Sequence, residues 1–305
     1  MNLLFYICLL YFTLLFGKCN EVIEVAYTKV NSGPRFEKAK EMGALENPEI
    51  NEASGMVVSR SNPDLIWVHN DSGDKSRLFL IDFYGRHKGV FNIKKTENRD
   101  WEDIAIGPGP EKGVNYIYVA DIGDNNDLIE IKQIYRFPEP DLNMHNYFPI
   151  KSNVRDAQII SFRFPDGNKD AETIFVDPNS ADIFIVSKKE AAVNVYLASY
   201  PQSLSEVITL EHVTTIDIQQ AVAGDISVDG NEILIKTYTD IYYWQRKEKE
   251  TIQKALKRTP RRLPYFVEPQ GEAIAWKVDA SGYFTLSEKV GDEIPKLYFY
   301  ERIKK

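Results

Sequence analysis

A short phrase recurs five times along this chain, each time with an acidic residue at or just before the start of an apolar strand. The five copies are NEASGMVVS from Asn51, DWEDIAIGP from Asp100, DAETIFVDP from Asp170, AVAGDISVDG from Ala221 and PQGEAIAWK from Pro269. Aligned on the first apolar residue of each strand, they register at Met56, Ile104, Ile174, Ile226 and Ile274, with spacings of 48, 70, 52 and 48 residues. A period of about 50 residues with several short strands per repeat predicts a β-propeller.

The repeats predict an all-β fold, a single propeller with five blades. A sixth blade is the alternative if the stretch 131–166 forms a degenerate blade of its own. We interpret the long spacing of 70 as an insertion before the outer strand of the second repeat. The last repeat has only three predicted strands, and we expect the segment 21–45 to supply the missing outer strand. Such a strand closes the ring and covers an exposed sheet edge.

The composition is that of a globular protein with a large core. The chain has 305 residues, 43% of them hydrophobic, and a formal net charge of −8. All-β domains of this size are commonly single domains. The negative charge argues against nucleic acid as a partner. The sequence sets no oligomeric state.

The N-terminal segment predicts export. The first 16 residues carry no charged side chain and are rich in Leu, Phe, Tyr and Ile, which favours a signal peptide over 1–19 and a propeller domain over 20–305. We therefore expect a secreted protein, extracellular or periplasmic, with no membrane span after signal removal. Lipid attachment at Cys19 and an uncleaved anchor are the alternatives. Both cysteines, Cys8 and Cys19, lie in this segment, so the propeller is expected to lack a disulfide.

The propeller path brings two kinds of loop to one end of the ring axis, which we call the mouth. One kind leads into the inner strand, and the other joins the second strand to the third. Acidic groups that meet there need a cation, a proton or a basic neighbour. The candidate metal ligands are Glu52, Glu102, Asp103, Glu172, Asp225 and Glu272. The candidate ligand-binding residues are Asn70, Asp71, Asp74, Asp121, Asp124, Asn125, Lys188, Lys236 and Glu288.

Alignment columns support the first set. Glu102, Glu172 and Glu272 share a column two residues before the anchor, and Asp103 and Asp225 share the next. The first repeat departs, with Ser54 in the glutamate column and Glu52 two residues earlier.

Calcium is the cofactor that such a mouth favours, because hard cations bind six to eight oxygen ligands. Zinc prefers His or Cys, and only His69 lies near the expected mouth. Two alternatives stay open. The carboxylates can form a structural network with Lys188 and Lys236, or carry proton chemistry without a metal. The loops NDSGD (70–74) and DIGDNN (121–126) are either ligand-bearing loops or Asx-type turns.

Two functions fit this pattern, and whether the protein is an enzyme stays open. The first is a secreted binding or scaffold protein whose acidic mouth recognises a small molecule or a glycan. The alternative is a calcium-dependent hydrolase of esters, lactones or phosphoesters, with Glu102, Glu172 and Glu272 on the metal and Lys188 or Lys236 on the substrate anion. No Gly-x-Ser-x-Gly motif occurs in the sequence, and the Ser-x-x-Lys match at 72–75 lies in a glycine-containing turn and not on a helix. The propeller fold hosts both classes.

The phrases NDSGD, DWEDIA, YVADIGDNN, IYRFPEP, FRFPDG–DAE–VDP and EPQGEAIAW resemble those of a widespread family of secreted β-propeller proteins whose activity is not established. The resemblance covers about 52–300. More weakly, the chain is similar to calcium-dependent propellers of the gluconolactonase, paraoxonase and phytase kinds, which hold a metal in the axial channel. That similarity implies the acidic mouth as the site. It implies no reaction, because the catalytic residues of those enzymes have no clear match here.

Overall fold

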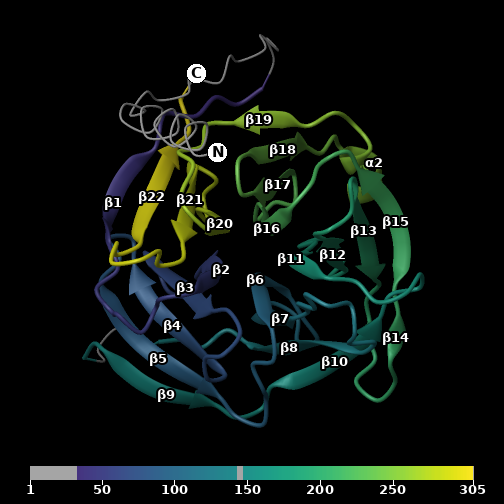
Figure 1. The fold of residues 1–305 in the computed structure, drawn as a ribbon, viewed down its shortest axis with the longest axis horizontal. Helices are drawn as coiled ribbons and strands as arrows, with labels where there is room; N and C mark the ends of the chain where they lie inside the picture. The colour runs from purple at the N-terminus through teal and green to yellow at the C-terminus, as the bar shows by residue number, and fades with distance from the viewer. Residues whose placement is uncertain (1–32, 143–146, 305) are drawn as a thin grey trace, which may run out of the picture. The chain divides into compact units, whose positions relative to one another are not determined.

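Five β-sheets stand as blades around a common axis (Figure 1). The structure is a computed structural model that describes residues 33–142 and 147–304. Its all-β, five-bladed propeller confirms the predicted fold. The stretch 131–166 forms no sixth blade, because its strands belong to the first two sheets. The predicted signal peptide over 1–19 lies outside the described residues.

The blades follow one another along the chain, each from its inner strand outward. Blade 1 contains β2 (Ala53–Val58), β3 (Leu65–Asn70), β4 (Arg77–Asp82), β5 (His87–Ile93) and β9 (Ile150–Val154). Blade 2 contains β6 (Trp101–Pro108), β7 (Asn115–Asp121), β8 (Lys132–Pro138), β10 (Gln158–Arg163) and β14 (Ile208–Thr209). Blade 3 contains β11 (Ala171–Val176), β12 (Ile183–Ser187), β13 (Val193–Ala198) and β15 (Glu211–Ile216). Blade 4 contains β16 (Ala221–Ile226), β17 (Glu232–Thr237), β18 (Ile241–Gln245) and β19 (Arg261–Leu263). Blade 5 contains β20 (Gly271–Trp276), β21 (Gly282–Ser287), β22 (Lys296–Glu301) and β1 (Lys40–Ala44).

The ring closes through a strand from the N-terminal side, as predicted. Strand β1 pairs antiparallel with β22, so Figure 1 shows the purple start of the described chain beside its yellow end. The inner strands of blades 1 and 5, β2 and β20, are also in contact. Closure pairs the edge of the last blade, which would otherwise be free to aggregate.

Apolar residues fill the spaces between blades rather than one central core. Each of the five blade interfaces has its own buried cluster. Trp101 lies at the interface of blades 1 and 2, and Trp276 at the interface of blades 4 and 5. Both cysteines precede the propeller strands in the sequence. Apolar packing between the blades of the closed ring is therefore the main source of stability.

The long second repeat contains an insertion, as predicted, and the insertion pairs with the outer strand of the neighbouring blade. After β8 the chain crosses to blade 1, adds β9 parallel to β5, and returns to blade 2 as β10. A second excursion leaves blade 3 after β13 and adds β14 parallel to β10. Neither parallel strand was predicted, because each is short and pairs with a blade distant in sequence.

Blade 4 differs from the expected pattern in its outer part. The charged stretch 247–256 favours a helix by its sequence, whereas α2 spans only Ile252–Leu256. The hydroxyl of Thr251 caps the helix by accepting a hydrogen bond from the amide of Lys254, so the helix begins only there. Strand β19 then completes the sheet. Among the described residues, no helix is long and apolar enough to cross a membrane.

Every inner strand has a β-bulge at the same place, and the bulge defines the repeat. The register shifts fall around Ser54, Glu102, Glu172, Val222 and Glu272. In blade 4 the position equivalent to Ile104 is therefore Gly224, which pairs with Ile235, and not Ile226. The predicted alignment of the fourth repeat was wrong by two residues, because a glycine at the anchor left Ile226 as the first large apolar residue. Asp103 and Asp225 consequently do not share a column.

Asp103 connects three blades. Its carboxylate accepts hydrogen bonds from the amides of Ile104 at 2.9 Å, Ile174 at 2.9 Å and Gly224 at 3.2 Å, and its side chain is fully buried. Asp225 connects blades 4 and 5 in the same way, accepting from the amides of Ile226 and Trp276. These two aspartates lock the inner strands together.

We predict that Asp103→Ala lowers the free energy of unfolding by about 2–4 kcal/mol, because it leaves three buried amides without their acceptor. Urea unfolding followed by circular dichroism measures the change. The control is Glu111→Ala, at an exposed position in the β6–β7 turn, which should change stability by less than about 0.5 kcal/mol. Equal stability of the two variants would contradict the locking role of Asp103.

Candidate metal centre at the mouth

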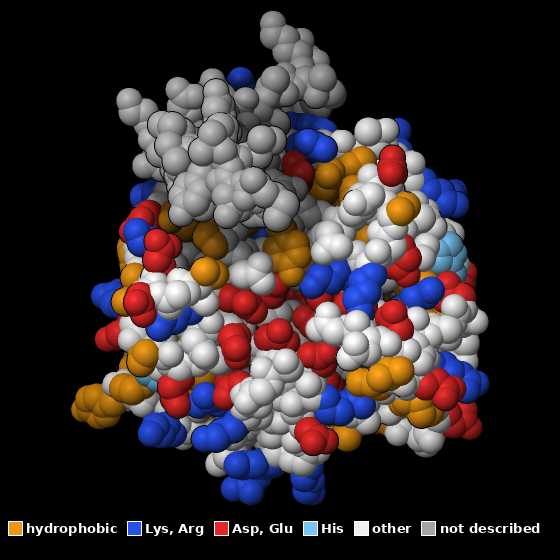
Figure 2. Space-filling view, viewed as in Figure 1, with side chains coloured by type: hydrophobic (Ala, Val, Ile, Leu, Met, Phe, Trp, Pro, Cys, Tyr) orange, Lys and Arg blue, Asp and Glu red, His pale blue; other side chains and the backbone are white. Residues whose placement is uncertain are grey.

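Two sets of equivalent positions surround the mouth. The first is the bulge set: Ser54, Glu102, Glu172, Val222 and Glu272. The second is the residue that follows the second strand of each blade: Asp71, Ile122, Lys188, Tyr238 and Glu288. In Figure 2, Asp and Glu side chains gather around the centre of the ring. The fold thus concentrates acidic groups where the inner strands begin.

Three carboxylates on blades 1 and 2 form what we call the first trio: Asp71, Asp100 and Glu102. One oxygen of each lies within 4.8 Å of the others. Glu102 is only 3% exposed, and no described residue donates a hydrogen bond to its carboxylate. Within the described chain, no lysine or arginine lies at ion-pair distance from any member of the trio. The first trio is therefore an oxygen-rich cluster without a neutralising partner.

Burial and mutual repulsion raise the pKa values of this cluster. Burial raises the pKa of Asp71 to about 6, with further contributions from Asp100 and Glu272. Burial and the neighbouring Asp170 raise the pKa of Asp100. The pKa of Glu102 lies well above its ordinary value because of burial and then of Glu172. A cation that bound here would favour the deprotonated carboxylates and oppose these shifts.

The absence of a side chain at Gly123 leaves space for the carboxylates of Glu102 and Asp100. A Cβ atom at this position would overlap Oε1 of Glu102 and Oδ2 of Asp100. The amide of Gly123 also donates to the backbone oxygen of Asp100 at 3.1 Å, which fixes the loop beneath the carboxylates.

The second trio shares Glu102 and adds Asp170 and Glu172 on blade 3. Unlike the first trio, it contacts ammonium groups. Lys188 binds Oε1 of Glu172, and Lys189 lies 3.1 Å from Oδ2 of Asp170. The other oxygen of Glu172, Oε2, is buried and has no hydrogen-bond partner among the described residues. Burial raises the pKa of Glu172 to about 8, although Lys188 opposes the shift.

Tyr238 extends this network to blade 5. Its hydroxyl accepts a hydrogen bond from Lys188 at 3.1 Å and donates to Oε1 of Glu272 at 2.6 Å. Glu288 stands beside Glu272, and burial followed by that neighbour raises the pKa of Glu288 to about 8. Glu52 is exposed at the rim.

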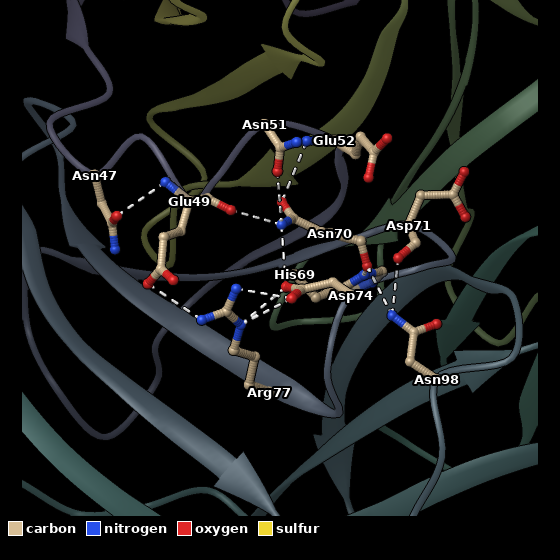
Figure 3. Close-up of polar contacts among 10 residues, drawn as sticks. All are labelled: Asn47, Glu49, Asn51, Glu52, His69, Asn70, Asp71, Asp74, Arg77 and Asn98. Atoms are coloured by element: carbon tan, nitrogen blue, oxygen red, sulfur yellow. Dashed lines mark hydrogen bonds and ion pairs between the residues drawn. The ribbon is translucent and has the colours of Figure 1, made fainter.

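The NDSGD loop divides its residues between two roles (Figure 3). The amide group of Asn70 donates to the backbone oxygen of Glu49 and to Asp74. Asp74 also accepts three hydrogen bonds from Arg77, at 3.1, 2.9 and 2.7 Å. These contacts shape the loop. The carboxylate of Asp71 points away from them and joins the first trio. Asn70 and Asp74 are thus structural, whereas Asp71 belongs to the candidate centre.

The DIGDNN loop is mainly structural. Asp121 accepts hydrogen bonds from Arg99 at 2.7 Å and from the amide of Asp100 at 2.9 Å. Asp124 accepts from the amides of Leu128 and Ile129 and pairs with the buried Lys132 at 3.0 Å. Asn125 is exposed. The contribution of this loop to the mouth is the space at Gly123.

Three further predicted site residues lie away from both trios. Asp103 and Asp225 are occupied by backbone amides between blades. Lys236 is fully buried two residues before Tyr238, where its ammonium donates to the backbone oxygens of Gly271 and Thr237 and lies 4.5 Å from the centre of the Tyr265 ring. Burial lowers the pKa of Lys236 to about 8.

The sequence places Asp100 and Asp170 in the loops that lead into the inner strands, but the candidate sets omitted both, and Tyr238 was not predicted. The aspartates carried a usable signal, since both stand two residues before a bulge glutamate in DWE and DAE. Tyr238 gave no such signal, because its place depends on where β17 ends.

No protein-family model matches this chain, and no curated protein matches it in sequence. Among solved structures, it is similar to a chain of a nidogen/laminin complex, with 8% identity, a TM-score of 0.44, and 78% of this chain and 73% of that chain covered. It is also similar to the WD40 repeats of RRP9, with 8% identity, a TM-score of 0.43, and 89% of this chain and 99% of that chain covered. At such identities the likeness concerns the fold alone.

We predict that the chelator-treated protein loses stability as the pH rises from 4 to 8. The folded-state pKa values of Asp71 and Glu102 are raised, so the folded protein binds protons more tightly than the unfolded chain over this range. The contribution is complete below pH about 4 and disappears as the pH passes through the folded values, with an effect of a few kcal/mol at most, about 1.4 per pKa unit. Urea midpoints across this range measure it. Glu102→Gln should flatten the profile, and a wild-type profile that is already flat would contradict the assignment.

Proposed function

We propose that this protein is a secreted binding or scaffold propeller that holds a divalent hard cation, calcium, at its mouth and recognises a ligand there. The observation that carries the proposal is the first trio. Three converging carboxylates with raised pKa values and no ammonium contact form an electrostatic arrangement that a cation would relieve.

The donor set fits calcium. Asp71, Asp100 and Glu102 would hold the ion, and carboxylate oxygens are the ligands that calcium prefers. Glu102 is 3% exposed and its carboxylate receives no hydrogen bond from the described chain, so a cation would give it a positive partner. A nitrogen-seeking metal fits poorly. His69 is fully buried, its Nδ1 bonds the backbone oxygen of Asn70, and its ring packs against Trp101. When bound, the cation would supply a positive charge to an otherwise acidic surface.

Binding fits the geometry better than hydrolysis. The hydrolase alternative requires a lysine that clamps a substrate anion, but Lys188 is held by Glu172 and Tyr238, and Lys236 is buried. The described mouth also contains no hydroxyl or thiol paired with a histidine base. A small-molecule or glycan ligand could supply oxygen atoms that complete the coordination shell of a cation at the mouth. Water molecules fill the same positions in many calcium sites.

We predict that calcium stabilises the purified protein at pH 7.5. A one-hundred-fold excess over the dissociation constant should add about 2.7 kcal/mol to the free energy of unfolding and raise the melting temperature by several degrees. Differential scanning calorimetry with calcium and with chelator measures the shift, and elemental analysis measures bound metal. Glu102→Gln should abolish the shift, whereas the exposed control Glu111→Gln should retain it.

No calcium-dependent shift and no bound metal would overturn the cation site and leave the carboxylates as a structural network. If calcium binds, glycan and small-molecule arrays probed with and without calcium test the recognition role. Retention of a ligand only with calcium, and its loss in Glu102→Gln, is the expected result.

A further inference from the structure

We propose that Lys188 is a tethered cation that fills the second trio. The mouth then takes one divalent cation, at the first trio, and gains a second cation site, bridged by Glu102, when the ammonium of Lys188 is removed. This inference rests on the proposed function. It adds where the cation binds, how many cations the mouth takes, and that Lys188 sets that number.

The two trios are geometrically alike. Each brings three carboxylate oxygens within 4.8 Å of one another, and Glu102 belongs to both. Because a carboxylate has two oxygens with several lone pairs, one glutamate can serve two neighbouring cations. Geometry alone therefore does not distinguish one cation site from two.

The counter-charges do distinguish them. In the described chain no lysine or arginine forms an ion pair with the first trio. In the second trio, Lys188 contacts Glu172, and Lys189 contacts Asp170 at 3.1 Å. The first oxygen of Asp170 is also in use, since it accepts from the amide of Asp124 at 2.7 Å. A divalent ion would meet a fixed ammonium at the second trio and none at the first.

Lys188 is fixed in the mouth rather than lying free on the surface. Its amide donates to the backbone oxygen of Asp170 at 3.0 Å, which anchors the residue at the end of β12. Its ammonium binds Glu172 and the hydroxyl of Tyr238, and it lies 5.3 Å from the centre of the Tyr238 ring. Only 15% of its side chain is exposed. The carboxylate and the phenol oxygen together form a cation-binding set that the chain itself occupies.

The occupation is incomplete, and this points to a site that a stronger cation can use. Oε2 of Glu172 is buried without a hydrogen-bond partner among the described residues, on a residue 3% exposed. The carboxylate of Glu102 next to it also receives no described donor. One ammonium carries a single charge and leaves these oxygens unsatisfied, whereas a divalent ion would engage both carboxylates.

The test is calcium stoichiometry, measured by isothermal titration calorimetry and equilibrium dialysis on chelator-treated protein at pH 7.5. We expect one calcium per chain in the wild type and two in Lys188→Met. Adding Glu172→Gln to Lys188→Met should return the value to one, because it removes a ligand of the second trio only. The matched control is Lys169→Met. Lys169 forms ion pairs with Asp166 and Glu190, which lie outside both trios. This variant should therefore bind one calcium ion per chain, as the wild type does.

The outcomes separate the two proposals. No calcium in any variant overturns the proposed function together with this inference. One calcium in both the wild type and Lys188→Met overturns the inference alone, as do two in the wild type. Circular dichroism establishes that each variant is folded. If Lys188→Met does not fold, Lys188→Gln takes its place, because it removes the same charge and keeps a polar group beside Tyr238. Two calcium ions per chain are then expected for Lys188→Gln.

Discussion

The convergence of five inner strands on one axis is the constraint on which the rest of this structure depends. Each inner strand bulges at the same point, and a bulge turns an extra residue out of the ladder. Three of the five bulge residues are glutamates: Glu102, Glu172 and Glu272. Ring closure by β1 prevents the blades from spreading to relieve the repulsion between these groups. The acidic mouth is thus built by the same geometry that holds the fold together.

The carboxylates near the axis fall into two classes according to their donors. Asp103, Asp225 and Asp124 accept hydrogen bonds from backbone amides, and those contacts lock strands and loops. The first trio has few donors by comparison: the amide of Ser72 donates to Asp71, and the side chain of Ser72 bonds Asp100. A buried carboxylate must find a donor, a proton or a cation. The first class has its hydrogen-bond donors within the chain, and the second is where we propose that a cation binds.

The blade number, the ring closure and the insertion could be read from sequence, because hydrophobic spacing reports directly on strand repeats. Side-chain direction could not, since one residue of register decides it. Asn70 closes β3 and faces the loop network, while Asp71, the next residue, faces the mouth. Lys188 follows β12 and reaches the mouth, whereas Lys236 lies within β17 and is buried. The ends of second strands, which short apolar runs do not mark sharply, decide which charged residues meet.

The five blades are not equivalent at the mouth, and the differences between them decide where the carboxylates gather. Blade 4 places Val222 at its bulge and Tyr238 after its second strand, so it brings no carboxylate to either set of mouth positions. Tyr238 instead connects Lys188 with Glu272, so the ammonium of Lys188 is held between blades 3, 4 and 5. Blades 1 and 2 retain Asp71, Asp100 and Glu102 without such compensation. The first trio therefore lies to one side of the axis, on blades 1 and 2, and a cation there would leave the opposite side free for contact with a ligand.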